Sequence, residues 1–599
     1  PLAYLQDTTG RLFGEFGVTI AAAVAISGFV ALTLSPALCA RVLRPAVPER
    51  GIKRALERAS QALERAYVAT LRGAFARRGL TIAAGAAWFA LGLGMLFAGV
   101  VEREFIPSSD RGGFFVFTRA PEGSTIEYAD RYQRRVEEVI RDSVPELDRY
   151  FSVIALGLGA PGLVNEGIVI GSLAEDRERT ARQVVEGLRD ELWAVTGTQA
   201  FPAEFPSLGR GFGAAPVSLV VQGPDIAAIA GYADEIARRA GEEIPGLYNA
   251  RSDLLLNKPQ LDVEIDRNRA ADLGVGVRDV ATTLQALLGE DDVSTFKVDG
   301  QTYDVIVQLE RRERSRPGDI PLLYVHGRGG ELIPLSSVVR ITETTAARGV
   351  PHYDRMRAAT VTANLSARLS QGDALARIQA IADDVLPGTG GFGTAFSGES
   401  EQFYESGQAI VFAYLLAIVI IYLVLAAQFE SFVHPLTILI AVAFSFTGAL
   451  VTLWAFGQTL NLFSQIGLVM LVGVVTKNSI LIVEFANQLR ERGRSVVDAG
   501  FEAARVRFRP ILMTALATMA GLLPVALGGH RAIGELLGIG AGGDLRAPLG
   551  IAVVGGVFFS SAFTFVVVPA AWVAVESLRE RRVRRGVTAA AEAKAAHAS

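Results

Sequence analysis

Long uninterrupted apolar runs constrain the fold of this chain more than any other feature. A helix needs about 20 consecutive apolar residues to cross the hydrocarbon core of a bilayer. The runs lie at about 16–37, 80–101, 408–427, 435–455, 461–485, 510–528 and 548–575. The mean hydropathy of +0.33 also exceeds that of a typical soluble protein. The sequence therefore predicts a polytopic α-helical membrane protein with seven spans.

Basic residues between the runs are distributed unevenly, and this sets the predicted orientation. The basic clusters lie at 41–78, 490–494, 505–509 and 579–585. Short cytoplasmic loops carry an excess of Lys and Arg, so all four clusters are predicted to be cytoplasmic. Seven spans with an outside start and an inside end satisfy the four assignments together.

The first basic cluster contains an amphipathic pattern. Its apolar residues recur at three- and four-residue steps, at Ile52, Leu56, Ala59, Leu63, Tyr67, Leu71 and Phe75. This spacing predicts a helix with one apolar face and arginines elsewhere. Two interpretations remain open: a helix lying along the inner membrane surface, or a helix packed on the rest of the protein.

Between Glu102 and about Ser406 the pattern becomes that of a soluble α+β domain on the outside. The first part predicts a strand at 112–119, a helix at 124–142, strands near 149–156 and 167–173, a helix at 179–195 and a strand near 199–204. Ser124 and Glu127 resemble a capping box at the first helix start. The order βαββαβ is the ferredoxin-like pattern.

A second copy of this pattern begins at 216–223 and is interrupted. It continues with a helix at 224–243 and a strand near 248–253, then resumes with a strand at 359–366, a helix at 372–386 and a strand near 393–397. The intervening residues 259–343 mix strands, a helix and a hairpin, which predicts an inserted subdomain. The outside domain is thus interpreted as two repeats.

Composition and motifs give little support to several function classes. The net charge of -4 does not suggest a nucleic-acid partner. The five histidines are scattered, the single cysteine Cys39 is interpreted as a small buried residue, and neither pattern suggests a metal site. The loop GLGAPG at 157–162 lacks the Lys-Ser/Thr of a phosphate-binding loop. We therefore expect neither an enzyme nor a cofactor.

Lys477 stands in the middle of the apolar stretch LVGVVTKNSILIVEFA, residues 471–486. A lysine at the centre of a bilayer costs about 2.5–3.5 kcal/mol on insertion scales, so a partner is expected. Glu484 is two helical turns away, about 10 Å, which makes it a poor direct partner. Asn478 is polar but uncharged, and the predicted spans contain no aspartate. The sequence therefore predicts a buried cation whose anion lies outside this chain or in a second copy of it.

At this point the residues carry a family resemblance. The segments VVTKNSILIVEFA and RVRFRPILMTALA (505–517) resemble the proton-relay region of resistance–nodulation–division (RND) efflux pumps. The segments AAQFESF (426–432), FIPSSDRGGF (105–114) and LTLSPALCARVLRP (32–45) match other stretches of that family in the same order. The closest group is the hydrophobe/amphiphile multidrug efflux pumps.

The resemblance implies that this chain is the C-terminal half of such a pump, and Pro1 is not a natural start. The paired intramembrane aspartates of the family would lie in the first half. Lys477 would pair with them, and Thr514, Arg507 and Asn478 would be further relay members. Two alternatives to a relay role stay open. The Thr514 hydroxyl would be bonded to its own helix backbone, and Arg507 would be an ordinary basic residue of a cytoplasmic loop.

The resemblance also implies a domain organisation. Residues 1–101 would hold the last helix of the first half, a cytoplasmic linker and the next helix; 102–212 one porter subdomain; 213–258 with 344–403 a second; 259–343 a docking subdomain; 404–578 a five-helix bundle; and 579–599 a cytoplasmic tail. The loop at 157–167 would be the switch loop beside the substrate path. Its candidate residues are Ile154, Leu158, Gly159, Leu163, Val164 and Ile170. They are mainly aliphatic, which predicts a wall without aromatic stacking.

The function implied is a proton-driven exporter of hydrophobic or amphiphilic compounds in the bacterial inner membrane. It would act as a homotrimer with a periplasmic adaptor protein and an outer-membrane channel. The alternatives are a heavy-metal exporter of the same superfamily, a non-transporting sterol-sensing or scaffold protein of related topology, and a broken gene product. Without the aspartate helix, residues 1–599 alone are expected to move no protons.

Overall fold

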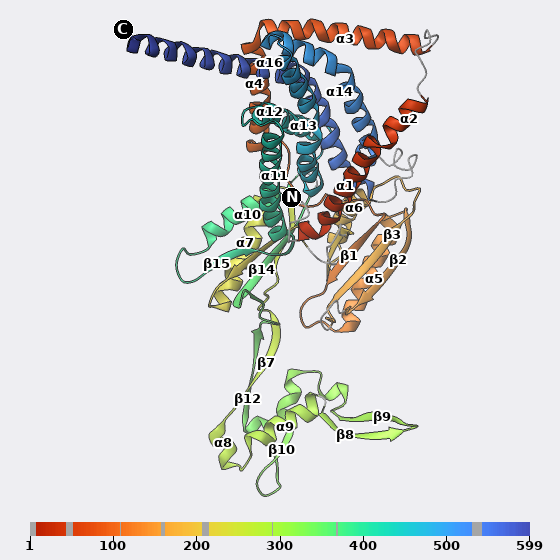
Figure 1. The fold of residues 1–599 in the computed structure, drawn as a ribbon. Coiled ribbons are helices and arrows are strands. Elements are labelled where there is room, and N and C mark those ends of the chain that lie inside the picture. Colours follow the sequence, from red (N-terminus) through yellow and green to blue (C-terminus); the bar gives the residue numbers. More distant parts are fainter. Residues whose placement is uncertain are drawn as a thin grey trace.

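The computed structural model describes residues 8–42, 52–107, 109–156, 162–205, 215–289, 291–366, 369–529 and 542–598. Figure 1 shows a helical bundle joined to two α+β units and an inserted subdomain. Within these residues, seven helical segments are long and apolar enough to cross a membrane: Gly14–Val42, Arg78–Phe97, Gly398–Gln428, His434–Ala455, Leu462–Glu491, Val496–Leu527 and Gly543–Arg581. Each overlaps one of the apolar runs predicted from the sequence.

The helices of the bundle are α1 (Thr8–Leu32), α2 (Leu34–Val42), α4 (Arg78–Phe97), α11 (Gly398–Gln428), α12 (His434–Ala455), α13 (Leu462–Glu491), α14 (Val496–Leu527) and α16 (Gly543–Ala598). Small residues let α12 and α16 approach closely. A Cβ placed on Gly448 of α12 would lie 2.6 Å from the Cβ of Phe559 on α16.

The first membrane segment is packed differently from the others. Residues 14–42 have no buried side chain within the chain, and Figure 1 shows α1 and α2 at the side of the bundle. Cys39 is exposed, so the interpretation of this cysteine as a buried residue was wrong.

Helix α3 (Ile52–Ala76) lies across the end of the bundle opposite the α+β units (Figure 1). Its C-terminal half packs on the protein: Tyr67, Leu71 and Phe75 are buried in one cluster with residues of α13, α14 and α16. Leu63, one turn earlier, is 49% exposed. Of the two interpretations left open, the packed helix therefore holds for residues 67–75.

The first α+β unit contains β1 (Gly113–Arg119), α5 (Ile126–Ser143), β2 (Leu147–Ile154), β3 (Glu166–Leu173), α6 (Ala181–Trp193) and β4 (Gln199–Glu204). Its antiparallel sheet has the order β2-β3-β1-β4. Phe114, Val116 and Val169 form a core on one face together with residues of α5 and α6. The cap of α5 is Thr125, whose hydroxyl accepts from the Tyr128 N–H, so the assignment of Ser124 was wrong by one residue.

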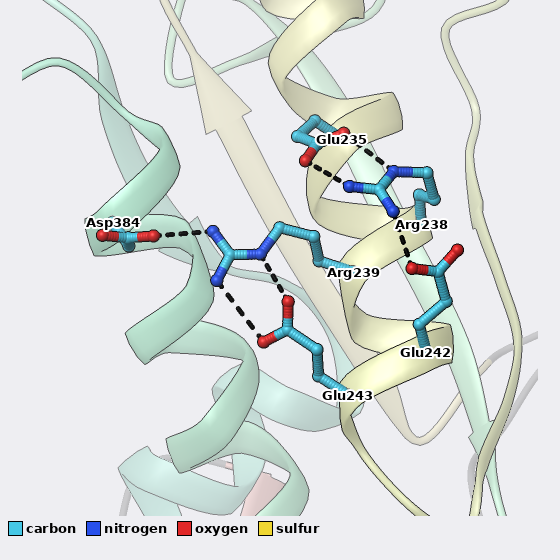
Figure 2. A network of polar contacts seen from close by, with 6 residues as sticks. All are labelled: Glu235, Arg238, Arg239, Glu242, Glu243 and Asp384. Carbon is cyan, nitrogen blue, oxygen red and sulfur yellow. Dashed lines mark hydrogen bonds and ion pairs between the residues drawn. The ribbon is translucent and has the colours of Figure 1, made fainter.

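The second α+β unit contains β5 (Val217–Gln222), α7 (Ile226–Glu243), β6 (Leu247–Ser252), β13 (His352–Tyr353), β14 (Met356–Leu365), α10 (Gln371–Val385) and β15 (Gly393–Phe396). Its sheet places β14 between β6 and β5, and β15 beyond β5. An ion-pair network joins its two helices (Figure 2). Arg239 of α7 forms ion pairs at 2.6 Å with Glu243 of the same helix and with Asp384 of α10.

The inserted subdomain is reached through a two-stranded ribbon of β7 (Lys258–Ile265) and β12 (Val339–Ala346), which leads away from the bundle in Figure 1. It contains α8 (Arg267–Asp272), α9 (Val277–Leu288), β8 (Asp291–Val298), β9 (Gln301–Val307), β10 (Tyr324–His326), β11 (Leu332–Pro334) and three short 3₁₀ turns. Val280, Val325 and Leu335 lie in its own small core.

Candidate functional site

Lys477 lies on α13, whose apolar part is among the most fully enclosed by neighbouring helices. Asn461 caps the start of α13, where its side-chain oxygen accepts from the Phe463 and Ser464 N–H groups at 3.1 Å. Most side chains that follow are buried, but Gly473 and Lys477, one turn apart, are exposed. Within the described residues, the Lys477 ammonium group has no hydrogen bond and no ion pair. The lysine thus faces out of this bundle at mid-span.

The other predicted relay residues, on α13 and α14, make their contacts with groups other than Lys477. Asn478 is 2% exposed and turns toward α16, where its Nδ2 donates to Ser561 at 3.4 Å. The Thr514 side chain is exposed on α14, and its hydroxyl donates to the Ile511 carbonyl of its own helix at 2.9 Å. Thr514 thus makes the hydrogen bond to its own helix backbone that was one of the two interpretations. Among the described residues, its hydroxyl has no partner outside α14.

Arg507 occupies a half-buried position near the start of α14. Its guanidinium lies 4.7 Å from the centre of the Phe485 ring on α13, a distance suited to a cation–π contact. Neighbouring Arg509 instead pairs with Glu64 of α3 at 2.8 Å. The arginines of this segment therefore connect α14 to α13 and α3, and among the described residues Arg507 makes no hydrogen bond to Lys477.

The predicted substrate-path residues are only partly described. Leu158 and Gly159 fall outside the described residues. Ile154, Leu163 and Ile170 are half-buried, and Val164 is 48% exposed. Ile154 ends β2, whereas Ile170 lies in the middle of β3 and therefore belongs to the sheet itself.

The sheet register adds aromatic residues that the linear stretch did not reveal. Directly opposite residues of neighbouring strands share one face of a sheet. One row of the first sheet is Phe151, Ile170, Phe115 and Ala203, and the next row is Val153, Ile168, Phe117 and Phe201. We call Phe115, Phe117, Phe151, Phe201, Ile168 and Ile170 the aromatic face. It lies on the side of the sheet away from α5 and α6, because the alternate residues Phe114 and Val116 form their core.

The aromatic face shares Ile170 with the predicted aliphatic wall, and that wall stays a prediction. That prediction considered only residues 154–170, but β1, β2 and β4 supply the phenylalanines. The continuous apolar run from Phe114 to Phe117 was the available signal, since it makes both faces of that strand apolar. Of the rings of the aromatic face, Phe151 is 59% exposed, whereas Phe115 is only 7% exposed.

Charged residues connect the aromatic face to the second unit. The Arg251 guanidinium of β6 lies 4.8 Å from the Phe201 ring centre, and Arg189 of α6 lies 3.7 Å from the Tyr248 ring centre. Burial lowers the pKa of Arg251 to about 10, and nearby Arg119 contributes in the same direction. Arg348 bridges the units through Glu122 at 2.9 Å.

These features define a class of protein. A large α+β region is attached to a bundle with membrane-length helices, and one of these presents at mid-span a lysine that has no partner in the described part of the chain. A charge in that position marks ion or substrate pathways in membrane proteins. The arrangement is that of a multi-pass membrane transporter.

Comparison with known proteins defines the family. The chain belongs to the AcrB/AcrD/AcrF family of the RND superfamily, whose profile matches residues 1–576. It is 31% identical to an uncharacterized transporter of Haemophilus influenzae over 95% of this chain and 54% of that protein. It is 30% identical to the multidrug resistance protein MdtC of Edwardsiella ictaluri over 98% of this chain and 56% of that protein.

The chain thus spans about half the length of the curated relatives it matches. The family match runs across the chain as a whole, and so it does not bear out the narrower expectation of a C-terminal half. Membership of a transporter family and several membrane-length helices are what the comparisons and the structure establish together.

Proposed function

We propose that this chain acts in proton-driven export of hydrophobic or amphiphilic compounds across a bacterial inner membrane. Support comes from the family, and from one relative whose name describes a multidrug resistance protein. The two α+β units would be the periplasmic porter subdomains, and the inserted residues 259–343 would be the docking subdomain. A homotrimer, an adaptor protein and an outer-membrane channel belong to the same proposal.

The observation that carries the proposal is Lys477 at the middle of α13, which is exposed and makes no ion pair with any residue that the structure describes. A lysine facing hydrocarbon is costly, so a carboxylate from a segment outside the described residues would cover it. Protonation of that carboxylate would remove its charge and weaken the pairing. A local change of charge of this kind can bias a two-state helix arrangement.

The membrane potential and the proton gradient would supply the free energy. Moving one elementary charge through 100 mV is worth about 2.3 kcal/mol. Thr514 and Arg507 lie on α14, which packs beside α13. Their proposed role is to carry or stabilise the proton near Lys477, and Asn478 would fix the rotation of α13 through its contact with Ser561.

The substrate would meet the aromatic face of the first unit. Its rings offer apolar area and stacking geometry without a fixed polar pattern, which suits varied amphiphilic compounds. Phe151 is 59% exposed and lies at the open edge of the sheet. The described path residues Ile154, Leu163, Val164 and Ile170 would line the same region, together with the undescribed Leu158 and Gly159.

A matched pair of lysine variants tests the proton-coupling proposal. Lys477→Ala should abolish proton-coupled dye export from cells expressing the native gene, while expression and membrane insertion stay normal. Lys258→Ala, at an exposed position that begins β7, is the control and should leave export unchanged. Normal drug resistance in the Lys477→Ala strain at equal expression would show that the relay assignment is wrong.

Two threonines on one helix separate the relay role of Thr514 from a backbone role. Thr518 donates to the Thr514 carbonyl at 2.8 Å, the same local bond that Thr514 makes to Ile511. Thr514→Val should reduce export, whereas Thr518→Val should not. Equal effects of both variants would assign Thr514 to the helix backbone alone.

Vesicles that hold only residues 1–599 provide a further test. We expect no proton-coupled export from them, because Lys477 has no carboxylate partner among the described residues. Export from such vesicles would contradict the need for an external carboxylate.

A further inference from the structure

A short segment, residues 102–106, lies between the bundle and the second α+β unit. We call it the strap. It follows α4 and runs beside the turn that begins α13, where Arg103 and Leu460 form a parallel bridge. The Leu460 N–H donates to the Glu102 carbonyl at 2.7 Å, and the Leu462 N–H donates to the Phe105 carbonyl at 3.1 Å. The strap is therefore bonded to the start of the helix that carries Lys477.

The other side of the strap is bonded to the start of α10. The Phe105 N–H donates to the Gln371 Oε1 at 2.8 Å, and the Gly372 N–H donates to the Arg103 carbonyl at 3.1 Å. The Gln371 Nε2 in turn donates to the Pro216 carbonyl at 2.8 Å, just before β5. Gln371 is only 3% exposed, and both polar atoms of its amide are used.

A serine extends this chain of hydrogen bonds to α11. The Ser400 hydroxyl donates to the same Pro216 carbonyl at 3.1 Å and accepts from the Ser218 N–H at 2.8 Å. Ser400 is fully buried, as is Asn461 at the start of α13. Pulling the strap away from Gln371 would leave buried donors and acceptors unpaired, which is unfavourable. The bonded groups should therefore move together.

We propose that the strap and Gln371 form a rigid link that carries displacement of α13 into the second α+β unit. The proposal rests on the proposed transport function, in which α13 moves when the charge next to Lys477 changes. Gln371 is then a positioning residue: it touches neither proton nor substrate, and it acts by holding the strap against α10.

The first experiment compares two glutamines of α10 in the protein expressed from its native gene. Gln371→Leu keeps the side-chain size and removes both hydrogen bonds. Gln379→Leu removes the bonds to Asp383 of the same helix and to Thr394 of β15. We expect Gln371→Leu to slow dye export about tenfold or more, as loss of a buried hydrogen bond allows. Gln379→Leu should export normally, and normal export by Gln371→Leu would overturn the link.

A disulfide can replace the lost hydrogen bonds. A Cβ on Gly372 would lie 3.4 Å from the Arg103 Cβ, near the usual disulfide separation of about 3.5–4.5 Å. Arg103→Cys with Gly372→Cys, in a Cys39→Ser background, should form this bond. Oxidation should restore export to the Gln371→Leu variant, and a reductant should reverse the gain. Inhibition of the Gln371 parent by the same disulfide would show that the strap must separate from α10, and would overturn the proposal.

Amide hydrogen exchange tests the rigid link without a transport measurement. Gln371→Leu should raise amide exchange about tenfold at residues 460–462 as well as at the Phe105 amide, because the loosened strap no longer holds α13. Unchanged exchange at 460–462 would overturn the link. If the parent protein shows no export, the proposed function fails, and this exchange measurement still decides the structural proposal.

Discussion

The docking of α3 on the bundle gives a quantitative prediction. The Tyr67 ring stacks on Phe508 with centroids 4.2 Å apart, and its hydroxyl donates to the Phe565 carbonyl at 2.9 Å. Tyr67 is 7% exposed, whereas Leu63 on the same helix is 49% exposed. If protein packing holds α3 in place, Tyr67→Ala should undock the helix and Leu63→Ala should not.

The size of the effect follows from the contacts that are lost. Truncation of a buried aromatic side chain to Ala costs about 3–5 kcal/mol. Tyr67→Phe keeps the ring and removes only the hydrogen bond, for a cost of about 1 kcal/mol. Since about 1.4 kcal/mol corresponds to tenfold in an equilibrium constant, the undocked population should rise at least a hundredfold for the first variant and about fivefold for the second.

Limited trypsin digestion of the protein in lipid nanodiscs measures this population. Cleavage at Arg65 or Arg72 requires local opening of α3, and its rate follows the open fraction when reclosing is fast. A fully exposed cleavage site elsewhere in the chain provides the internal control. The expected order of cleavage rates is Tyr67→Ala, then Tyr67→Phe, then Leu63→Ala equal to the parent.

An alkaline titration adds an independent check. Burial raises the pKa of the Tyr67 phenol above its ordinary value of 10.0. When docking raises the pKa of an acid, the acid's contribution to docking is fully present below the pKa of the undocked state. That contribution is lost as the pH rises above this value. Docking of α3 should therefore weaken above about pH 10 in the parent protein. The Tyr67→Phe variant has no phenol at this position, so it should lack this loss. Equal cleavage of Tyr67→Ala and Leu63→Ala would show that lipid, and not protein packing, holds α3.

Three further predictions concern the α+β units and the bundle. Phe114→Ala should lower the unfolding free energy of the first unit by about 3–5 kcal/mol, because Phe114 is fully buried. Chemical denaturation measures this change. Phe151→Ala, at a 59% exposed site, should cost less than about 0.5 kcal/mol. The Arg179 hydrogen bond lowers the pKa of Glu146 to about 2, so its stabilising contribution is present above pH 4.5 and is lost as pH falls toward 2; Glu146→Gln should flatten an acid unfolding curve over this range. Asn461→Ala should destabilise the start of α13 by about 0.5–2 kcal/mol through loss of its cap, and faster hydrogen exchange at Phe463 is the readout.

Secondary structure was predictable where local sequence determines it. Apolar runs located each membrane helix because a span must satisfy its backbone hydrogen bonds internally. The strands of the α+β units could be located because apolar residues cluster between turn residues. The error at the start of α5 has a local cause: Ser124 and Thr125 are both good capping residues, and the chain uses Thr125.

The candidate site was predictable only in part. Lys477 was identifiable because a lysine in an apolar run is rare, whatever its surroundings. The direction of its side chain was not, since rotation of α13 in the bundle depends on which residues pack against α12 and α16. Asn478, the next residue, consequently turns to Ser561 while Lys477 faces outward.

The sequence by itself located the seven membrane-length helices found among the described residues, and it singled out the unusual position of Lys477. These depend on hydropathy and on local periodicity, which act over a few neighbouring residues. Only the tertiary structure decided that Phe115, Phe151 and Phe201 share one sheet face, and that Gln371 is bonded to the strap. Strand register and helix docking join residues up to several hundred positions apart, and no local pattern encodes those pairings.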